Sequence, residues 1–424
     1  MDKWLIRGAR LVDPSQKLDE IGDILFVDGV VAAIGGSITA DARVIEAVGL
    51  VCAPGLVDMH VHLREPGQTH KEDILTGCAA AAAGGVTSLA CMPNTQPACD
   101  TPEVIASILE KAREARARVY PVAAITRGLG GEQLTDFAAL AAAGAAAVSD
   151  DGRPVPTAGL MALAMEQAAR CGLPVLSHCE ELSLVRGGIM HEGTVSRELG
   201  VPGIHRGAEE VATAREIALA AATGCPVHIC HVSTAGSVAL LRDAKRRGVP
   251  VTGETAPHYV ALTDECLRGR DADYRMNPPL RTEADRLAVI EGLRDGTLEV
   301  IATDHAPHAP EEKADFLTAP NGAIGMETSL AACITWLVQP GILSLPALIR
   351  LMSTRPAELL RIPAGSLRAG APADAVLFHP GEAWTVQPDK LHGKSRNCCF
   401  KGRTLTGRVH ATFLGGQPVY SINR

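Results

Sequence analysis

Two histidines in the stretch 57–64 are spaced so that they could hold a metal ion. Apolar and polar residues alternate strictly through this stretch, which predicts a β-strand with Asp58, His60, His62 and Arg64 on one face. Two neighbouring imidazoles can ligate one metal ion, and Asp58 could fix the tautomer of a ring from behind. A solvated strand face with two incidental histidines is the alternative, and the rest of the chain decides between them.

Histidines and acidic residues recur at the ends of later strands. Strands are expected at 56–62, 86–91, 119–124, 146–149, 174–178, 226–231, 250–254 and 299–304, with helices between them, for example at 73–83, 102–116, 157–171, 208–222 and 235–247. This alternation predicts an α/β fold, a (β/α)8 TIM-type barrel, in which functional side chains gather at the carboxyl ends of the strands. An open doubly wound sheet is the alternative, but no glycine-rich phosphate loop follows the first strand. Those ends carry His60, His62, Asn94, Asp150, Asp151, His178, His231, Glu254 and Asp304.

Four histidines and at least two aspartates at one end of a barrel predict a metal site. These ligands are more than one zinc ion usually takes, and they suit two ions joined by a bridging carboxylate and a bridging hydroxide. We therefore expect one or two Zn²⁺ per chain, with two favoured. Because a metal lowers the pKa of bound water, the hydroxide would be the nucleophile, and Asp304 could both contact a metal and take the proton.

The two ends of the chain differ from its middle. Short strands punctuated by Gly and Asp are expected in 4–34, and the tail from about 373 has the same character. This predicts a small composite β-sandwich domain from residues 1–54 and 367–424 around a barrel at 55–366. The segments 180–207 and 305–325 are expected to be long loops, which often carry function.

Composition narrows the function classes. The net charge of −8 over 424 residues argues against nucleic acid or an anionic membrane as the main partner. No apolar run reaches transmembrane length, and Met1-Asp2-Lys3-Trp4 has no signal-peptide architecture, so a cytoplasmic location is expected. The twelve cysteines lack CxxC spacing and are expected to be buried thiols, the adjacent Cys398-Cys399 pair included.

Short motifs lie at the strand ends and in the tail of the chain. They are 54–67 with its Arg64-Glu65-Pro66-Gly67, then 92–95, 149–152, 177–180, 231–234, 302–308 and 394–397. Together these motifs resemble those of the cyclic amidohydrolases, and of the dihydroorotase family in particular. The resemblance covers nearly the whole chain and implies an amidohydrolase barrel with a composite β-domain. It also implies reversible cyclisation of N-carbamoyl-L-aspartate to L-dihydroorotate, a step of pyrimidine (UMP) synthesis.

The resemblance also implies metal ligands. His60 and His62 would hold one ion with Asp304, and His178 and His231 the other. Many amidohydrolases bridge the two ions with a carboxylated lysine, but this chain has no lysine between Lys111 and Lys245. Asp151 is the natural substitute, as in one bacterial class of dihydroorotases, and Asp150 is the less favoured choice.

Substrate contacts follow from charge and from the same resemblance. Dihydroorotate carries a carboxylate, which Arg64 could bind with a bidentate fork while Asn94 adds an amide hydrogen bond. His308 resembles a further carboxylate contact, Asn277 a ring contact, and backbone groups near Gly322 are expected to close over the ring. Surface ion pairing for Arg64 and turn formation for the two asparagines are the alternatives. Glu254 is expected to be a structural hydrogen-bond partner, and His305 to point away from the site.

Two other functions compete with this interpretation. An allantoinase or dihydropyrimidinase would act on a substrate without that carboxylate and would not need Arg64. Those families also resemble enzymes whose metals are bridged by a carboxylated lysine, which this chain cannot supply. An inactive homologue could serve as a structural partner of aspartate transcarbamoylase, but such a protein would have lost metal ligands. A homodimer or higher oligomer is expected, and a complex of an active enzyme with aspartate transcarbamoylase stays open.

Overall fold

In the computed structural model, which describes residues 3–422, eight parallel strands form a closed barrel. They belong to two four-stranded sheets, ordered β6-β7-β8-β9 and β10-β13-β14-β15. Parallel bridges from Val148 to Val175 and from Val61 to His305 join the two sheets and close the ring. The strands are β6 (Leu56–Val61), β7 (Val86–Cys91), β8 (Arg118–Ala124), β9 (Ala147–Ser149), β10 (Leu176–Ser177), β13 (Val227–Ile229), β14 (Val251–Thr255) and β15 (Val300–Ile301).

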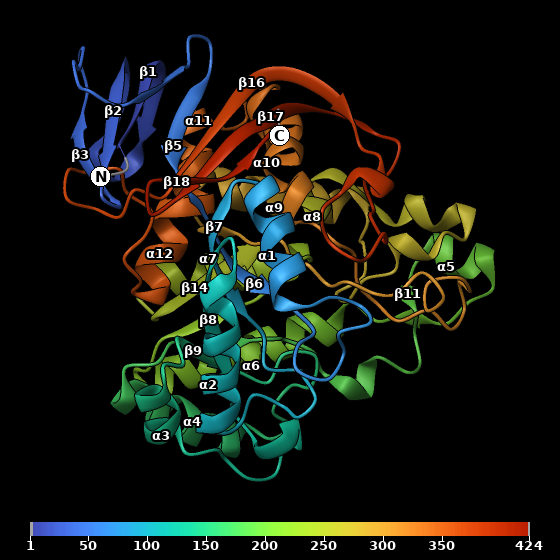
Figure 1. Cartoon of the computed structure of the whole chain (residues 1–424). Coiled ribbons are helices and arrows are strands. Elements are labelled where there is room, and N and C mark those ends of the chain that lie inside the picture. The colour runs from blue at the N-terminus through green and yellow to red at the C-terminus, as the bar shows by residue number, and fades with distance from the viewer. Residues whose placement is uncertain (1–2, 423–424) are drawn as a thin grey trace.

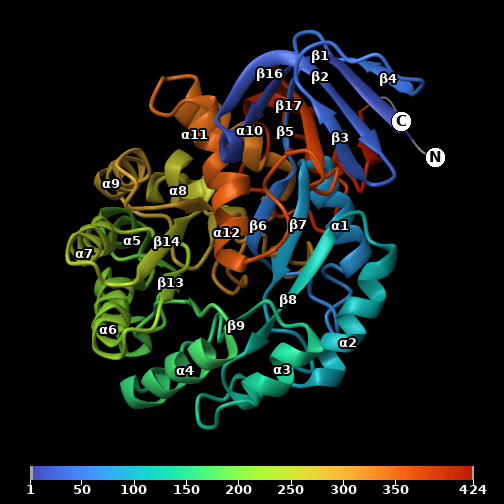
Figure 2. The same cartoon turned by 90° about the vertical axis from the view of Figure 1, so that its left-hand side faces the viewer.

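Helices surround the barrel on its outer side (Figure 2). Several begin at an Asp or Thr whose side chain accepts a hydrogen bond from the first helical turn, as Asp73, Asp136 and Thr157 do. Gly144 and Gly172 end two of them in the left-handed conformation, for which glycine has no steric cost. The outer helices are α1 (Ile74–Ala83), α2 (Pro102–Lys111), α3 (Phe137–Ala143), α4 (Ala158–Cys171), α6 (Gly207–Thr223), α7 (Ala235–Arg246) and α9 (Glu283–Arg294).

Both ends of the chain contribute strands to one further eight-stranded sheet, which forms the β-domain beside the barrel (Figure 1). Its order is β18-β17-β16-β5-β1-β2-β3, and β4 also pairs with β1. Alternate residues serve two cores: Cys52 and Leu377 pack inside this domain, whereas Ala53 and Val376 pack with the barrel. The strands are β1 (Lys3–Asp13), β2 (Leu18–Val27), β3 (Val30–Ile34), β4 (Arg43–Glu46), β5 (Val51–Pro54), β16 (Ala375–Thr385), β17 (Thr404–Leu414) and β18 (Gln417–Ser421).

The strand that carries the first two histidines does not alternate as its sequence predicts. Its register against β7 shifts between Asp58 and Val61, which is the signature of a β-bulge. Asp58 instead accepts hydrogen bonds from the backbone N and the Oγ1 of Thr303, at 3.0 and 2.5 Å. The expectation that Asp58 shares a face with the histidines and fixes one of their rings is therefore wrong. Strand β6 also ends before Arg64, which has a positive φ of 60°.

The first of the two expected loops is partly regular. Residues 180–207 contain α5 (Thr194–Leu199) and a two-stranded parallel sheet of β11 (Met190–His191) and β12 (Gly203–Ile204). These elements are too short to show a periodic pattern in the sequence. Residues 305–325 contain no helix or strand and run over the barrel mouth, as expected of a loop.

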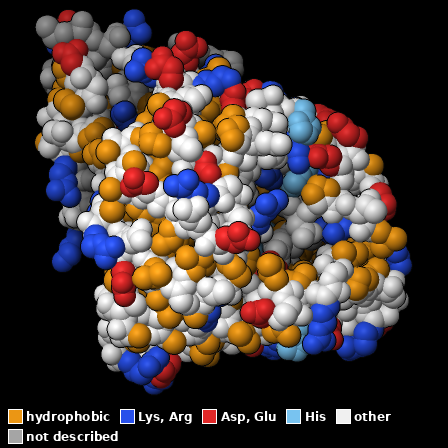
Figure 3. All heavy atoms as spheres, turned by 90° about the horizontal axis from the view of Figure 1, so that it is seen from below, with side chains coloured by type: hydrophobic (Ala, Val, Ile, Leu, Met, Phe, Trp, Pro, Cys, Tyr) orange, Lys and Arg blue, Asp and Glu red, His pale blue; other side chains and the backbone are white. Residues whose placement is uncertain are grey.

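The surface and the thiols agree with the composition. Acidic and basic side chains are interspersed over the face shown in Figure 3, without a large field of one sign. No helix within residues 3–422 has the length and apolar character needed to cross a bilayer. All twelve cysteines lie in the described part of the chain as free thiols, and Cys398 and Cys399 are buried.

Asp374 joins the β-domain to the barrel, so its removal should destabilise the protein. Its carboxylate accepts Nε and Nη2 of Arg118 at 2.8 and 3.1 Å and the backbone N of Gly415 at 2.6 Å. Asp374→Ala leaves these donors unpaired and should lower the free energy of unfolding by about 2–3 kcal/mol, measured by urea denaturation. Glu46→Ala, which breaks an exposed pair with Arg7, is the control and should cost less than about 1 kcal/mol. Equal losses in the two variants would contradict the prediction.

Candidate metal centre and substrate pocket

Asp151 lies among four histidine rings at the carboxyl end of the barrel. Its Oδ1 is 3.3 Å from His60 Nε2, 3.5 Å from His178 Nδ1 and 3.7 Å from His231 Nε2, and its Oδ2 is 3.5 Å from His62 Nε2. All five side chains are buried. His60 and His62 lie at the end of β6, and the other three residues follow β9, β10 and β13. The closure of the barrel therefore brings together side chains that are distant in the sequence.

The same atoms form two groups that could each hold a metal ion, and Asp151 belongs to both. One group is His60, His62 and Asp151, and the other is Asp151, His178 and His231. Ligand atoms about 2.0–2.2 Å from a tetrahedral zinc lie about 3.3–3.6 Å from one another, close to the separations around Asp151. Within residues 3–422, His60 Nε2 and Asp151 Oδ1 are also buried without a hydrogen-bond partner. Buried polar atoms seldom lack partners, so these two atoms fit a bound cation.

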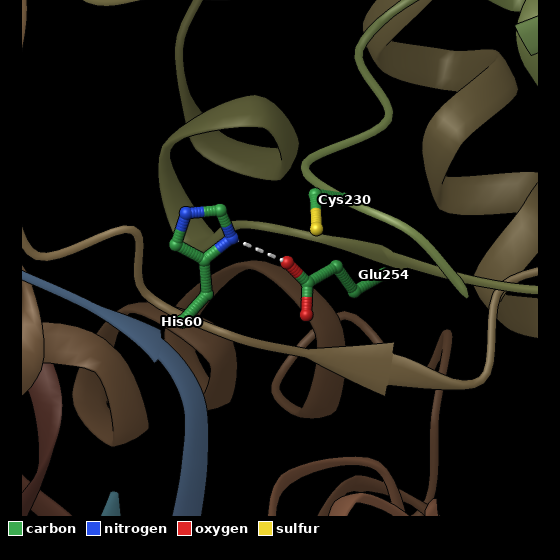
Figure 4. Close-up of side chains that lie close together, drawn as sticks. All are labelled: His60, Cys230 and Glu254. Carbon is green, nitrogen blue, oxygen red and sulfur yellow. Dashed lines mark hydrogen bonds and ion pairs between the residues drawn. The ribbon is translucent and has the colours of Figure 1, made fainter. Parts of the chain in front are cut away.

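The ring nitrogens that face away from the centre have partners that orient the rings. His60 Nδ1 lies 2.8 Å from Glu254 Oε1, and His62 Nδ1 lies 2.8 Å from Asn94 Oδ1. A carboxylate or amide oxygen behind a ring fixes the tautomer that leaves the other nitrogen free to ligate. Figure 4 shows the first of these contacts, with the sulfur of Cys230 close to both side chains. His60, Cys230 and Glu254 form a third group of possible ligands, but burial raises the pKa of Cys230 and keeps it a thiol.

Asp304 completes the centre from the end of β15. Its Oδ1 is 3.1 Å from His62 Nε2 and 3.7 Å from His60 Nε2. Burial alone would raise the pKa of Asp304, but the hydrogen bond from His62 and the charges of nearby histidines lower it below its ordinary value. Burial likewise opposes the ionisation of Asp151, and the pKa of that carboxyl is lowered by His60. Both aspartates are therefore carboxylates at neutral pH.

Three residues at the barrel mouth have a backbone conformation that residues other than glycine rarely adopt. The φ angles are 60° at Arg64, 36° at His231 and 48° at Asp304. Such conformations cost about 1–3 kcal/mol each and cluster at functional sites. Each of these three side chains points into the same pocket.

That pocket is a cavity of about 210 Å³ directly over the histidine and aspartate cluster. Every residue assigned to the substrate from the sequence lines it, and so do the described ligands except the deeply buried His60. The lining comprises His62, Arg64, Asn94, Asp151, Gly152, His178, His231, Asn277, Asp304, Ala306, His308, Asn321 and Gly322.

Arg64 is the one arginine or lysine side chain in this lining, so it is the one lining group that carries a permanent positive charge. It is 8% exposed, its Nε donates to the Pro307 carbonyl at 3.0 Å, and its Nη2 lies 3.3 Å from His308 Nε2. Within residues 3–422 no carboxylate oxygen lies within 4.0 Å of it. Burial lowers the pKa of Arg64 to about 10, so the guanidinium keeps its charge at neutral pH. Burial and the charge of Arg64 lower the pKa of His308 to about 3, so that ring is neutral.

The two asparagines have protein partners that the sequence did not indicate. Asn94 contacts His62, and Asn277 Nδ2 donates to Glu180 Oε1 at 3.0 Å. Glu180 in turn lies 3.3 Å from His178 Nε2, so it stands behind that ring as Glu254 does behind His60. Glu180 belongs to the motif 177–180, but no role for it was predicted from the sequence. Its position two residues after a strand-end histidine could have indicated one.

Gly322 shapes the wall of the pocket. A Cβ at this position would meet Ala306 Cβ at 2.7 Å and His308 Nε2 at 3.1 Å, and its φ is 136°. Its N–H donates to the Arg275 carbonyl, and its own carbonyl accepts Lys313 Nζ and Asn397 Nδ2, both at 3.0 Å. The loop is thus fixed at the pocket through Gly322.

Asp150 and His305 are neighbours of the proposed ligands in the sequence, but their side chains do not belong to the metal centre. The Asp150 carboxylate accepts hydrogen bonds from the backbone N and the Oγ1 of Thr126. His305 Nδ1 accepts from the backbone N of Gly325 at 3.1 Å, and its ring does not line the pocket. Both placements agree with the sequence-based preference for Asp151 and Asp304.

Comparison with known proteins finds relatives over the whole chain. The family described as dihydro-orotase-like matches residues 49–237. The dihydroorotase of Geotalea daltonii is 50% identical over 419 residues, 98% of each chain. That of Geobacter metallireducens is 50% identical over 420 residues, 98% of this chain and 99% of the relative.

Solved structures of similar fold include a hydantoinase and a dihydropyrimidinase. The L-hydantoinase (dihydropyrimidinase) from Arthrobacter aurescens superposes with a TM-score of 0.89 at 25% identity, covering 99% of this chain and 96% of that one. The dihydropyrimidinase from Brevibacillus agri NCHU1002 gives 0.86 at 27% identity, covering 99% and 95%. These neighbours bear out the prediction of a TIM-type barrel with a β-sandwich domain.

Because Asp151 belongs to both groups of ligands, its loss should affect metal binding more than the loss of one histidine. His178→Ala or His231→Ala should lower metal content and activity together but leave the His60–His62 group intact. Asp151→Ala should reduce bound metal further, measured as metal per chain by mass spectrometry after dialysis. Full metal retention with full activity in both histidine variants would refute the assignment, and a metal content in Asp151→Ala equal to that of the wild type would refute the shared role.

Proposed function

The chain belongs to the dihydroorotase family and acts as a dihydroorotase, a hydrolase of cyclic amide bonds, and from that premise we propose which of its side chains carry out the reaction. The reaction is the reversible cyclisation of N-carbamoyl-L-aspartate to L-dihydroorotate. The observation that supports our assignment best is the buried guanidinium of Arg64, which shares one pocket with the histidine and aspartate cluster and has no carboxylate partner among the described residues.

The metal centre is proposed to hold two zinc ions. His60 and His62 with Asp304 would hold one, His178 and His231 the other, and Asp151 would bridge them. Bound zinc would polarise the reacting carbonyl and lower the pKa of a coordinated water. The family is metal-dependent, and the donor set of imidazoles and carboxylates suits zinc. Metal analysis of the purified protein would test which metal binds and how many ions each chain holds.

Arg64 is proposed to bind the substrate carboxylate. A buried cation needs an anionic partner, and a planar guanidinium matches a carboxylate in two parallel hydrogen bonds. His308 and Asn94 would flank the same carboxylate, while Asn277 and the backbone at Gly322 would border the ring. This arrangement favours dihydroorotate over the uncharged rings of hydantoinases and dihydropyrimidinases, which offer Arg64 no partner.

Asp304 is proposed to carry the proton. It lines the pocket beside His62, where it can accept a proton from the attacking water and pass it to the ring nitrogen. That nitrogen is a poor leaving group until it is protonated, so the same carboxyl serves first as base and then as acid. In cyclisation these steps run in reverse.

Other expectations from the sequence are carried into this proposal. They are a division of the chain into a β-domain of 1–54 and 367–424 and a barrel of 55–366, a cytoplasmic location, a homodimer or larger oligomer, and a complex with aspartate transcarbamoylase. Light scattering of the purified protein, alone and mixed with that enzyme, tests the last two.

Replacing Arg64 should separate charged from uncharged substrates. Arg64→Met removes the fork but keeps an extended side chain, and it should cost on the order of 2–5 kcal/mol of transition-state binding for dihydroorotate. Arg64→Lys keeps the charge without the fork and should fall between this variant and the wild type. The measurement is kcat/KM in both directions. An unchanged value for Arg64→Met would show that Arg64 is not the anchor.

Replacing Asp304 should separate proton transfer from metal binding. Asp304→Asn keeps the size and one oxygen that can still ligate, but it cannot carry the proton. Activity in both directions should fall by roughly 10²-fold or more, while the histidines retain much of the metal. Metal content and both rates are measured on one preparation. Normal turnover with normal metal content would exclude Asp304 as the proton carrier and point to His308 or a water molecule.

A further inference from the structure

A buried chain of hydrogen bonds runs from the opposite end of the barrel to His60. Thr252 Oγ1 lies 2.8 Å from His228 Nδ1, His228 Nε2 lies 3.2 Å from Glu254 Oε2, and Glu254 Oε1 lies 2.8 Å from His60 Nδ1. His228, Glu254 and His60 are 4%, 1% and 0% exposed. The last link is the dashed contact of Figure 4.

The strand geometry explains why these four side chains meet. His228 and Thr252 are directly paired in the register of β13 and β14, and Glu254 lies two residues beyond Thr252 on the same face. Leu176 of β10, which pairs with His228 on its other side, belongs to the apolar cluster inside the barrel. His228 therefore occupies a layer of the barrel interior beneath the metal centre, where side chains from neighbouring strands stack.

The direction of the hydrogen bonds follows from one requirement. If His60 Nε2 is to ligate, its proton must be on Nδ1, which then donates to Glu254 Oε1. Glu254 is a carboxylate and accepts only, so His228 Nε2 must be the donor to Oε2. In the neutral ring, His228 Nδ1 is then an acceptor, and the Thr252 hydroxyl donates to it. Every donor along the chain then meets an acceptor, and the lone pair of His60 Nε2 stays free to ligate.

We propose that His228 is a positioning residue for the metal centre, which fixes Glu254 so that Glu254 fixes the ring and tautomer of His60. This inference rests on the proposed ligation by His60. Among residues 3–422, these two histidines are the only side chains that hydrogen-bond to the Glu254 carboxylate. Without His228 the carboxylate would keep one donor in a fully buried place, and it would be free to turn at the expense of its contact with His60.

The surroundings of His228 make the inference testable without rebuilding the core. His228 and Thr252 line a cavity of about 420 Å³ at the closed end of the barrel, together with Met59, Leu176 and Leu359. A side chain at position 228 can therefore be exchanged beside existing free volume. Leu176 borders the same cavity, is 1% exposed and makes no side-chain hydrogen bond, so Leu176→Ala is a control for loss of packing alone.

The experiment compares three variants by the rate at which a chelator removes zinc from the purified enzyme. His228→Leu removes the donor to Glu254 and should lose zinc roughly 10- to 100-fold faster than the wild type, since partners behind a ligand typically contribute that much to metal affinity. His228→Gln places an amide N–H near the former Nε2 and should restore slow release. Leu176→Ala should lower the melting temperature but release zinc at the wild-type rate.

The outcomes divide clearly. Wild-type release from His228→Leu overturns the inference, as does equally fast release from His228→Leu and His228→Gln, because the donor would then be irrelevant. Fast release from Leu176→Ala would also overturn it by showing that packing alone controls the rate. A wild-type enzyme that binds no metal would instead refute the proposed metal centre, so the two failures are distinguishable.

Discussion

The architecture of this protein depends on a buried carboxylate shared by four imidazoles. Asp151 is buried at the floor of the pocket, and its charge is stabilised by rings that approach it from both halves of the barrel. In the absence of a cation, such a cluster holds polar atoms without partners, His60 Nε2 and Asp151 Oδ1 among them. A bound cation would satisfy both atoms, which is why we treat the cluster as a metal centre rather than as a structural core. The closure of the barrel between β9 and β10 and between β6 and β15 is what brings these ligands together.

If Asp151 bridges two ions as proposed, this chain differs from the lysine-bridged pattern of many amidohydrolases. A carboxylated lysine reaches the metals with a long side chain, whereas an aspartate must start close to them. Asp151 stands two residues beyond the end of β9, and the neighbouring Asp150 accepts hydrogen bonds from Thr126, which lies two residues beyond the end of β8. Because these hydrogen bonds hold the Asp150 side chain away from the histidines, the next residue, Asp151, faces the centre. The pair of aspartates thus divides into one anchor and one proposed ligand.

Periodicity and strand-end residues allowed the barrel and the composite β-domain to be predicted from the sequence, whereas Asn277, His308 and Gly322 entered only through the family resemblance. The misses have local physical causes. Strict alternation placed Asp58 beside His60, but a bulge in β6 shifts the register, and single-sequence patterns do not reveal bulges. Arg64 reaches the pocket through a positive φ after the strand has ended, not by sharing a strand face. The role of His228 follows only from a partner distant in sequence, Glu254, whereas Glu180 lies two residues after His178 and could have been recognised from that position.

The same structure explains why function here costs stability. Arg64 is a buried cation without a carboxylate partner among the described residues, and burial lowers its pKa to about 10. Asp151 and Asp304 lie near enough to offset part of it, since their charges favour the guanidinium. The positive φ angles at Arg64, His231 and Asp304 add backbone strain at the same place. An apolar side chain at position 64 would remove the desolvation cost, and a stabler protein would result. The presence of a guanidinium at this position is therefore best explained by an anion that binds in the pocket. Such an anion would offset the desolvation cost of Arg64 when it is bound.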